Sequence, residues 1–356
     1  MSYPFAELLI AGFDGTTATR DVLGLARRGL GGVILFGRNI EAPAQVAELT
    51  HDLRLANPDI IVSVDQEGGR VARFRAPWTE FPDMATLGEI NDVALTRRVA
   101  EVFAAELAAV GVNLDFAPVL DVHTNPANPI IGRRALSADA KQVSAHAVEF
   151  LSTLQLRHVA ACGKHFPGHG DAALDSHKDL PVIAHDLPRL RETEFVPFIA
   201  AAKAGVASIM TAHIRVPHVD EAPATLSSTW MQLLREEIGF SGVIVSDDLE
   251  MKAIADRFAP DIAVRKAIEA GVDIVLECNS RDRVESALST LSAMWGDITV
   301  RARMDDARKR IAKLRTSYPA PAARTRDEIR DNIGCPAHLA VRDEVLRRLE
   351  AAPKHH

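Results

Sequence analysis

Residues 159–171 read VAACGKHFPGHGD, in which a short apolar run passes into a loop crowded with charged and imidazole side chains. Val159–Cys162 is predicted to be a buried strand, and the glycines and the proline that follow are typical of a shaped loop. The polar character continues to Asp175-Ser176-His177. Because α/β folds often keep their chemistry in loops at the carboxyl ends of parallel strands, this stretch predicts an α/β fold with a functional loop at this position.

Seven further apolar runs resemble the strand that begins at Val159, and stretches with helical spacing separate them. The eight predicted strands are Leu8–Phe13, Gly32–Phe36, Ile60–Val64, Val112–Phe116, Val159–Cys162, Ala207–Thr211, Val243–Ser246 and Val272–Glu277. The predicted helices include Val93–Val110, Lys141–Leu156, Leu190–Ala204, Trp230–Ile238 and Asp261–Ala270. Such alternation indicates parallel strands with helical crossovers, and eight strands close a (β/α)8 barrel. The predicted fold class is therefore α/β, a TIM-type barrel in a single domain.

An open doubly wound sheet is the alternative fold. That fold favours a GxGxxG dinucleotide loop after the first strand, and Gly12-Phe13-Asp14-Gly15 does not match it. The barrel is therefore preferred, with residues 1–318 as the catalytic domain. Asp305–Thr316 is predicted to be a basic, solvated helix, and residues 319–356 to form a C-terminal strap and a helix that pack on the barrel.

Polar residues follow many of the predicted strands. They are Asp65–Arg70 after the third strand, Asp121 and Gly132–Arg134 after the fourth, residues 163–177 after the fifth, His213 after the sixth, and Asp247 with Asp248 after the seventh. Since the carboxyl ends of all barrel strands face the same end of the barrel, these groups are expected to converge there.

The composition is that of an ordinary globular protein, with 47% hydrophobic and 25% charged residues. A net charge of −7 and a pI near 6.0 argue against a nucleic-acid partner. Cys162, Cys278 and Cys335 are far apart, as expected of reduced thiols in a cytoplasm. The N-terminus has no signal-peptide pattern, and no apolar run approaches the ~18 residues that cross a bilayer. We therefore expect a cytoplasmic protein without a membrane partner, and the oligomeric state is left open.

Asp247 follows the stiff apolar strand Val243–Ser246, and two roles are open for it. A carboxylate that is held rigidly and partly desolvated can act as a nucleophile. Alternatively, Asp247 caps a helix that begins at Leu249. Its neighbour Asp248 is expected to point to the opposite side if the strand pleat continues.

Asp175 and His177 are two residues apart, and residues with that spacing share a side in extended backbone. Asp175 could therefore bind one ring nitrogen of His177, fix its tautomer and present the other nitrogen as a general acid/base. Two unrelated loop residues are the alternative. A metal site made from these two side chains with His165 and His169 is disfavoured, because a loop rich in glycine and proline does not hold an HxxxH pair on one helical face.

Asp65, Arg73, Arg134 and Lys164 form a dense set of polar groups for one end of a barrel. An aspartate can accept hydrogen bonds from paired sugar hydroxyls, and lysine and arginine can donate to ring hydroxyls or to a carboxylate. Any one of the four, taken alone, is more often part of a surface salt bridge.

Several of the residues singled out so far lie in longer motifs that resemble glycoside hydrolase family 3, and within it the single-domain bacterial β-N-acetylhexosaminidases of cell-wall recycling. The motifs are Gly31–Phe36, Val64–Val71, Phe116–Val122, Lys164–Gly170 with Asp175–His177, and Ser246–Met251. They occur in the family's order over residues 8–280, and the motif that begins at Lys164 is highly specific.

The resemblance implies a (β/α)8 barrel that releases β-linked N-acetylglucosamine with retention, through a covalent glycosyl-enzyme. It implies that Asp247 is the nucleophile, His177 the acid/base and Asp175 its partner. It places Asp65, Arg73, Arg134, Lys164 and His165 around the sugar, and it implies no metal and no cofactor. The implied substrate is the N-acetylglucosaminyl-1,6-anhydromuramoyl fragment of peptidoglycan, with or without peptide.

Three other functions remain open at this point. A β-N-acetylglucosaminide phosphorylase fits because a histidine, unlike a second carboxylate, would not repel phosphate. A catalytically silent sugar-binding barrel is disfavoured by the intact set of Asp175, His177 and Asp247. A metal-dependent hydrolase is the weakest of the three.

Overall fold

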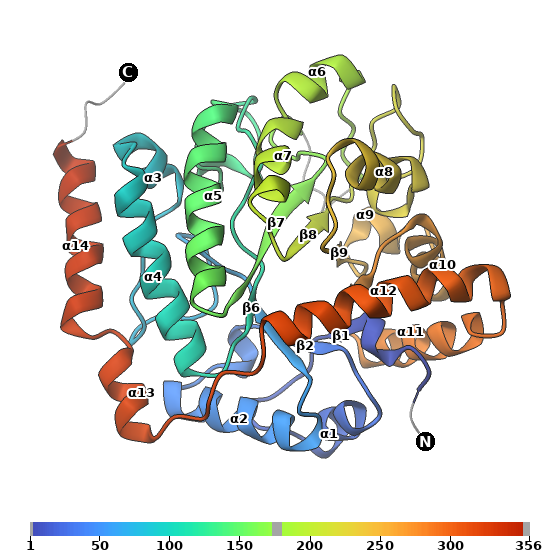
Figure 1. The fold of residues 1–356 in the computed structure, drawn as a ribbon, viewed down its shortest axis with the longest axis horizontal. Helices are drawn as coiled ribbons and strands as arrows, with labels where there is room; N and C mark the ends of the chain where they lie inside the picture. Colours follow the sequence, from blue (N-terminus) through green and yellow to red (C-terminus); the bar gives the residue numbers. More distant parts are fainter. Residues whose placement is uncertain (1–2, 173–179, 352–356) are drawn as a thin grey trace.

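Eight parallel strands close into a barrel in the spatial order β1-β10-β9-β8-β7-β6-β3-β2 in the computed structural model, which describes residues 3–172 and 180–351 (Figure 1). The strands are β1 Leu9–Ala11, β2 Gly32–Leu35, β3 Ile61–Val64, β6 Leu114–Asp115, β7 Ala160–Phe166, β8 Ser208–Thr211, β9 Val243–Asp248 and β10 Ile274–Glu277. All eight predicted strands are present, and the predicted TIM-type barrel is confirmed. The short hairpin of β4 Gln66–Gly68 and β5 Val71–Ala72 stands apart from the barrel, directly after β3.

Helices surround the barrel and connect its strands (Figure 1). They are α1 Arg20–Arg27, α2 Pro43–Ala56, α3 Ala85–Ile90, α4 Val93–Ala109, α5 Ala140–Leu156, α6 Leu187–Glu192, α7 Phe195–Lys203, α8 Ser228–Gln232, α9 Lys252–Ala255, α10 Pro260–Ala270, α11 Arg281–Met294, α12 Ile298–Ser317, α13 Arg326–Asn332 and α14 Pro336–Ala351. Several begin at a carboxylate that accepts hydrogen bonds from free backbone N–H groups, as Asp92 does for α4 and Asp139 for α5.

Two predicted helices are interrupted. The stretch 190–204 divides into α6 and α7, and Pro197 lies in the first turn of α7, where its missing N–H breaks no helical hydrogen bond. The stretch 230–238 divides into α8 and a π-helical turn, Leu233–Glu237. In both places the apolar spacing is helical, but the pattern alone does not reveal the interruption.

Helix α12 covers the amino-terminal end of the barrel, so the prediction of a solvated helix at 305–316 was wrong for one of its faces. Met304, Ala307, Ile311 and Leu314 are buried. On the same helix, Arg303 and Arg310 bind Asp273, which directly precedes β10, at 2.8 and 3.1 Å. Some of the charges on this helix therefore bind a strand end, while others, such as Lys309, are exposed.

Residues after α12 cross to the far side of the molecule and end in α13 and α14. Helix α13 contacts α2 and α4, and α14 contacts α3 and α4, at the left of Figure 1. Within residues 3–172 and 180–351, no helix combines the length and the apolar character that a membrane crossing requires.

Trp230 is fully buried beside the rings of Phe166 and Phe195, at centroid distances of 5.9 and 6.3 Å. We expect Trp230→Ala to lower the free energy of unfolding by about 3–5 kcal/mol, because it leaves a cavity in the core. Leu156→Ala, at a side chain that is 78% exposed, is the control and should cost less than about 0.5 kcal/mol. Urea denaturation measures both, and similar small losses would contradict the packing described here.

Candidate active site

Strand β7 carries polar side chains into the barrel's interior at its carboxyl end. It runs to Phe166, so Lys164 and His165 lie in the strand and not in the loop, and the predicted strand end at Cys162 was too early. The Lys164–His165 and Phe166–Pro167 peptide bonds are cis. Both polar side chains are buried, which means that their partners must lie within the fold.

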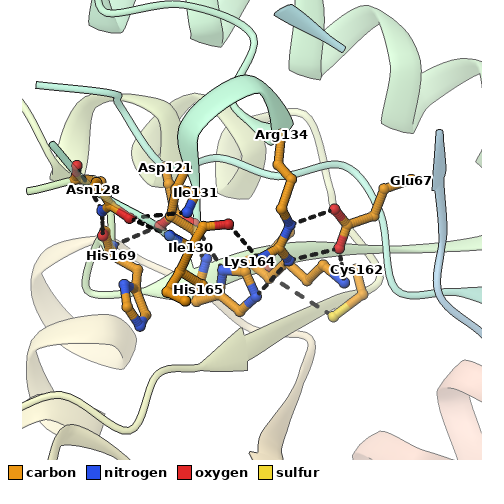
Figure 2. A network of polar contacts seen from close by, with 12 residues as sticks. Glu67, Asp121, Asn128, Ile130, Ile131, Arg134, Cys162, Lys164, His165 and His169 are labelled. Carbon is orange, nitrogen blue, oxygen red and sulfur yellow. Dashed lines mark hydrogen bonds and ion pairs between the residues drawn. The ribbon is translucent and has the colours of Figure 1, made fainter. Parts of the chain in front are cut away.

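Lys164 is at the centre of a buried ion-pair network (Figure 2). Its Nζ lies 2.8 Å from Asp65 Oδ1 and 2.5 Å from Glu67 Oε1. Arg134 binds the same Glu67 through two hydrogen bonds, each of 2.8 Å, from Nε and Nη2. The side chains of Lys164 and Glu67 are each only 2% exposed. The network therefore joins β7, the hairpin after β3, and the 3-10 turn Gly132–Arg134.

The ion pairs keep every member of this network charged. Burial alone would raise the pKa of Glu67, but Arg134 and Lys164 lower it well below its usual range. Burial alone would lower the pKa of Lys164, but Asp65 and Glu67 raise it. Burial raises the pKa of the neighbouring Asp115 well above its usual range, and its Oδ1 accepts a hydrogen bond from Gln66 N.

Arg73 joins the network from the other side of Asp65. Its Nη2 lies 3.1 Å from Asp65 Oδ2, and its guanidinium lies 5.3 Å from the centre of the Phe36 ring. Gln66 fixes the backbone here, because its Oε1 accepts hydrogen bonds from the N–H groups of Arg73 and Phe74. The Arg73 Nε is buried and has no acceptor in the part of the chain that the structure describes.

Asp121 organises the histidines of the 163–171 stretch (Figure 2). It accepts hydrogen bonds from His165 Nδ1 at 2.7 Å and from the backbone N–H groups of His165 and His169. When His165 carries its proton on Nδ1 and donates it to Asp121, its Nε2 is free to accept a hydrogen bond from Arg134 Nη2, 3.4 Å away. Burial lowers the pKa of His169 to about 4, so its ring is neutral near pH 7. Asn128 holds the carbonyls of His169 and Gly170, which fixes the start of the loop.

Asp247 and Asp248 end β9 and serve different neighbours, as the strand pleat predicts. The alternative reading of Asp247 as a helix cap is wrong, because α9 begins at Lys252, after Met251, without a side-chain cap. Asp247 lies close enough to His169 for its charge to act on the pKa of that ring. The Oδ1 of Asp248 instead accepts hydrogen bonds from Glu250 N and Cys278 N, and burial raises the pKa of Asp248 to about 7.

A second group of acidic residues, on the loops after β9 and β10, has a structural role. Asp248, Glu250 and Glu277 are the one set of three possible metal ligands that lies close together among the described residues, within 4.8 Å. Glu250 accepts hydrogen bonds from the backbone after β10, and Glu277 binds Arg283 at 2.8 Å. These contacts already use the carboxylates to join the loops after β9 and β10.

Asp175 and His177 lie outside the described residues, so their predicted pairing stays a prediction, as does the disfavoured metal site that includes them. The described residues on either side of them are held in place. Asp171 lies 2.8 Å from His185 Nε2, and its Oδ1 accepts a hydrogen bond from Thr124. His213 contacts Thr225 and the carbonyl of Asp248 and so supports β9.

The structure thus brings together the five predicted sugar contacts, Asp65, Arg73, Arg134, Lys164 and His165. Sequence reasoning placed Glu67 and Asp121 among the polar groups expected to converge, but it did not single them out as site residues. Both had a signal, because Glu67 shares a side with Asp65 in extended backbone, and Asp121 interrupts an apolar run where an unpaired charge would be costly.

Comparison with known proteins agrees with this geometry. The model of the glycosyl hydrolase family 3 N-terminal domain matches residues 6–314. A β-hexosaminidase of Nitrosomonas eutropha is 40% identical over 81% of this chain and 85% of its own length, and one of Neisseria meningitidis serogroup C is 42% identical over 72% and 73%.

Two solved structures are similar over nearly the whole chain. A family 3 β-N-acetylglucosaminidase from Paenibacillus sp. FPU-7 has a TM-score of 0.91 and 35% identity, over 97% of this chain and 68% of that one. NagZ from Neisseria gonorrhoeae, in complex with N-trifluoroacetyl-D-glucosamine, has a TM-score of 0.79 and 30% identity, over 96% and 98%.

Glu67→Gln should destabilise the protein, because it leaves Lys164 and Arg134 buried without one of their counter-charges. We expect a loss of about 3–5 kcal/mol near pH 7. The native pKa of Glu67 is depressed, so its contribution is complete above the unfolded pKa of about 4.3 and is lost as the pH falls through the native pKa. The difference between wild type and variant should therefore shrink as the pH falls below about 4.

Urea denaturation at a series of pH values measures this difference. The control is Glu149→Gln, which removes the charge from a partly exposed pair with Arg97 and should cost no more than about 1 kcal/mol. A Glu67 variant as stable as the Glu149 variant would contradict the role of the network.

Proposed function

The chain belongs to glycoside hydrolase family 3, and on that premise we propose that it is a retaining exo-β-N-acetylglucosaminidase of peptidoglycan recycling. The family match and the β-hexosaminidase relatives make it a glycoside hydrolase of the β-N-acetylhexosaminidase type. Our finer proposal is that it releases N-acetylglucosamine from N-acetylglucosaminyl-1,6-anhydromuramic acid, with or without peptide. We propose the cytoplasm as its location, since Cys162, Cys278 and Cys335 are free thiols.

The buried network around Lys164 is the observation that carries this proposal. Asp65 and Glu67 use two of the three N–H donors of the ammonium group, which leaves the third to point at a ligand. Arg73 adds a buried Nε that has no acceptor among the described residues. Such rigid, partly satisfied donors and acceptors suit the hydroxyl groups of a sugar, because the polar groups do not have to be ordered on binding.

We assign the five converging residues to the N-acetylglucosamine unit. Lys164, Arg73 and Arg134 donate to its oxygens, and Asp65 accepts from a hydroxyl while it holds Lys164 and Arg73 in place. His165 is fixed by Asp121 and lies beside Arg134. Because each side chain is already held by a neighbour in the network, the binding geometry is set before the sugar arrives.

In the proposed mechanism Asp247 attacks the anomeric carbon, and the bond to the leaving oxygen breaks through an oxocarbenium-like transition state. His177, oriented by Asp175, protonates that oxygen. The same histidine then removes a proton from water, which attacks the glycosyl-enzyme and releases the sugar with retained configuration. Retaining glycosidases usually have two carboxylates ~5 Å apart. A histidine in place of the second removes a negative charge near an anionic leaving group such as the muramoyl lactate.

Asp247→Asn should abolish hydrolysis of every substrate, with less than about 1% of wild-type kcat remaining, because the amide cannot form the glycosyl-enzyme. Asp248→Asn is the matched control one residue away and should retain much more activity. Product analysis of the wild type in phosphate buffer should give free N-acetylglucosamine. N-Acetylglucosamine 1-phosphate as the main product would instead support the phosphorylase.

Labelling with a 2-acetamido-5-fluoro sugar supports the same test. Mass spectrometry should find the trapped sugar on Asp247. A label on another residue, or substantial turnover by the Asn variant, would remove Asp247 from the nucleophile's role.

His177→Ala should slow substrates with poor leaving groups far more than nitrophenyl glycosides, because a good leaving group needs little protonation. We expect a loss in kcat/KM of about 100-fold or more for the natural disaccharide. Steady-state kinetics on both substrate types measure the difference. Equal losses on the two would rule out the acid role.

A further inference from the structure

Glu106 of α4 is a buried carboxylate whose neighbours include no lysine or arginine within ion-pair distance in the described part of the chain, and its side chain is 6% exposed. Its Oε1 accepts hydrogen bonds from Thr79 Oγ1 at 2.7 Å and from Gly334 N and His338 Nδ1 at 2.9 Å. Its Oε2 accepts one from Thr79 N at 2.9 Å. One carboxylate therefore joins three segments that are far apart in the sequence: α4, the loop after β5, and the C-terminal segment 318–351.

The loop after β5 connects Thr79 to Arg73, one of the proposed sugar contacts. Phe74 stacks on Trp78 with the ring centres 4.8 Å apart, and both rings are buried. The backbone N–H groups of Arg73 and Phe74 are bound to Gln66. Because this short loop is closely packed at both ends, a shift at Thr79 is transmitted to the backbone of Arg73.

The C-terminal segment also contacts this loop directly, backbone against backbone. Gly334 has a φ of +56°, and a Cβ built there would lie 2.1 Å from the carbonyl oxygen of Pro77. Only glycine allows the two backbones to approach this closely. The segment lies beyond the end of the family match at residue 314, so this support comes from outside the part of the chain that defines the family.

We propose that Glu106 is a positioning residue, through which His338 and the C-terminal segment hold the loop 73–81 so that Arg73 meets the sugar. The proposal rests on the proposed role of Arg73 as a sugar contact. Glu106 itself does not touch the substrate, and its effect on activity passes through Thr79 and the loop. The C-terminal segment thereby supports substrate binding from the outer face of α4.

Steady-state kinetics on a nitrophenyl N-acetylglucosaminide test this role. His338→Ala removes one donor from Glu106 and should raise KM about fivefold, with kcat changed by less than about twofold. His338→Asn keeps a donor near the position of Nδ1 and should restore KM. Thr79→Val removes the hydroxyl donor from the other side and should reproduce the rise in KM, which keeps the test available if one variant folds poorly.

A double-mutant cycle with Arg73→Ala identifies the route. If Glu106 acts through Arg73, His338→Ala should raise KM no further in the Arg73→Ala background. Arg98→Ala is the matched control, because it breaks the 2.6 Å pair between Arg98 and Glu344 of α14 without touching Glu106. It should leave KM within about twofold of the wild-type value.

Four results would overturn the proposal. The first is an equal rise in KM from His338→Ala with and without Arg73, and the second is an equal rise from Arg98→Ala. The third is a rise in KM from Arg73→Ala with none from His338→Ala or Thr79→Val, which would leave the sugar contact intact and remove only the positioning role. The fourth, an unchanged KM in Arg73→Ala, would instead reject the sugar contact itself, and the positioning role with it.

Discussion

The site depends on one buried ammonium group. Lys164 is almost fully enclosed, and its charge is balanced by Asp65 and Glu67, which follow β3, the strand on the other side of β6 from β7. An ammonium group in this position without a counter-charge would cost several kcal/mol. The carboxyl end of β3, the hairpin that follows it and the turn that carries Arg134 must therefore all take their places around β7. The geometry offered to a sugar is a consequence of that requirement.

The barrel itself could be predicted from sequence because its strands are buried on both faces and read as apolar runs separated by helical spacing. The end of β7 could not be predicted in this way. Lys164 and His165 remain in the strand because they are paired with Asp65 and Asp121, which are 99 and 44 residues away. On α12, Arg303 and Arg310 likewise find a distant partner in Asp273, beside a buried apolar face. The local sequence pattern predicts that a charged side chain is exposed to solvent. Its burial becomes evident only when its ion-pair partner, far away in the sequence, is known.

The candidate site was predictable to the extent that its residues sit at strand ends. Asp65, Arg73, Arg134, Lys164 and His165 converge because parallel strands all deliver their carboxyl ends to one end of the barrel. Glu67 and Asp121 are different, since each acts by holding another side chain of the site. Sequence motifs draw attention to groups that could contact a ligand. A residue that only holds an arginine or a histidine in place is easily overlooked. The support that Glu106 gives to the loop after β5 lies one step further away, and nothing in the local sequence around Glu106 points to it.

Asp247 and Asp248 are adjacent in β9, and the pleat of the strand turns their side chains to opposite sides. A nucleophilic carboxylate must be ionised near neutral pH and must have an oxygen available. Asp248 suits this role poorly, because burial raises its pKa to about 7 and its Oδ1 is bound to the backbone of Glu250 and Cys278. Asp247 instead lies close enough to His169 to act on the pKa of that ring, and its Oδ1 accepts a hydrogen bond from Asp248 N. Two identical side chains, one residue apart, thus meet different surroundings, and this difference supports the proposal that Asp247, as the family's motif implies, is the nucleophile.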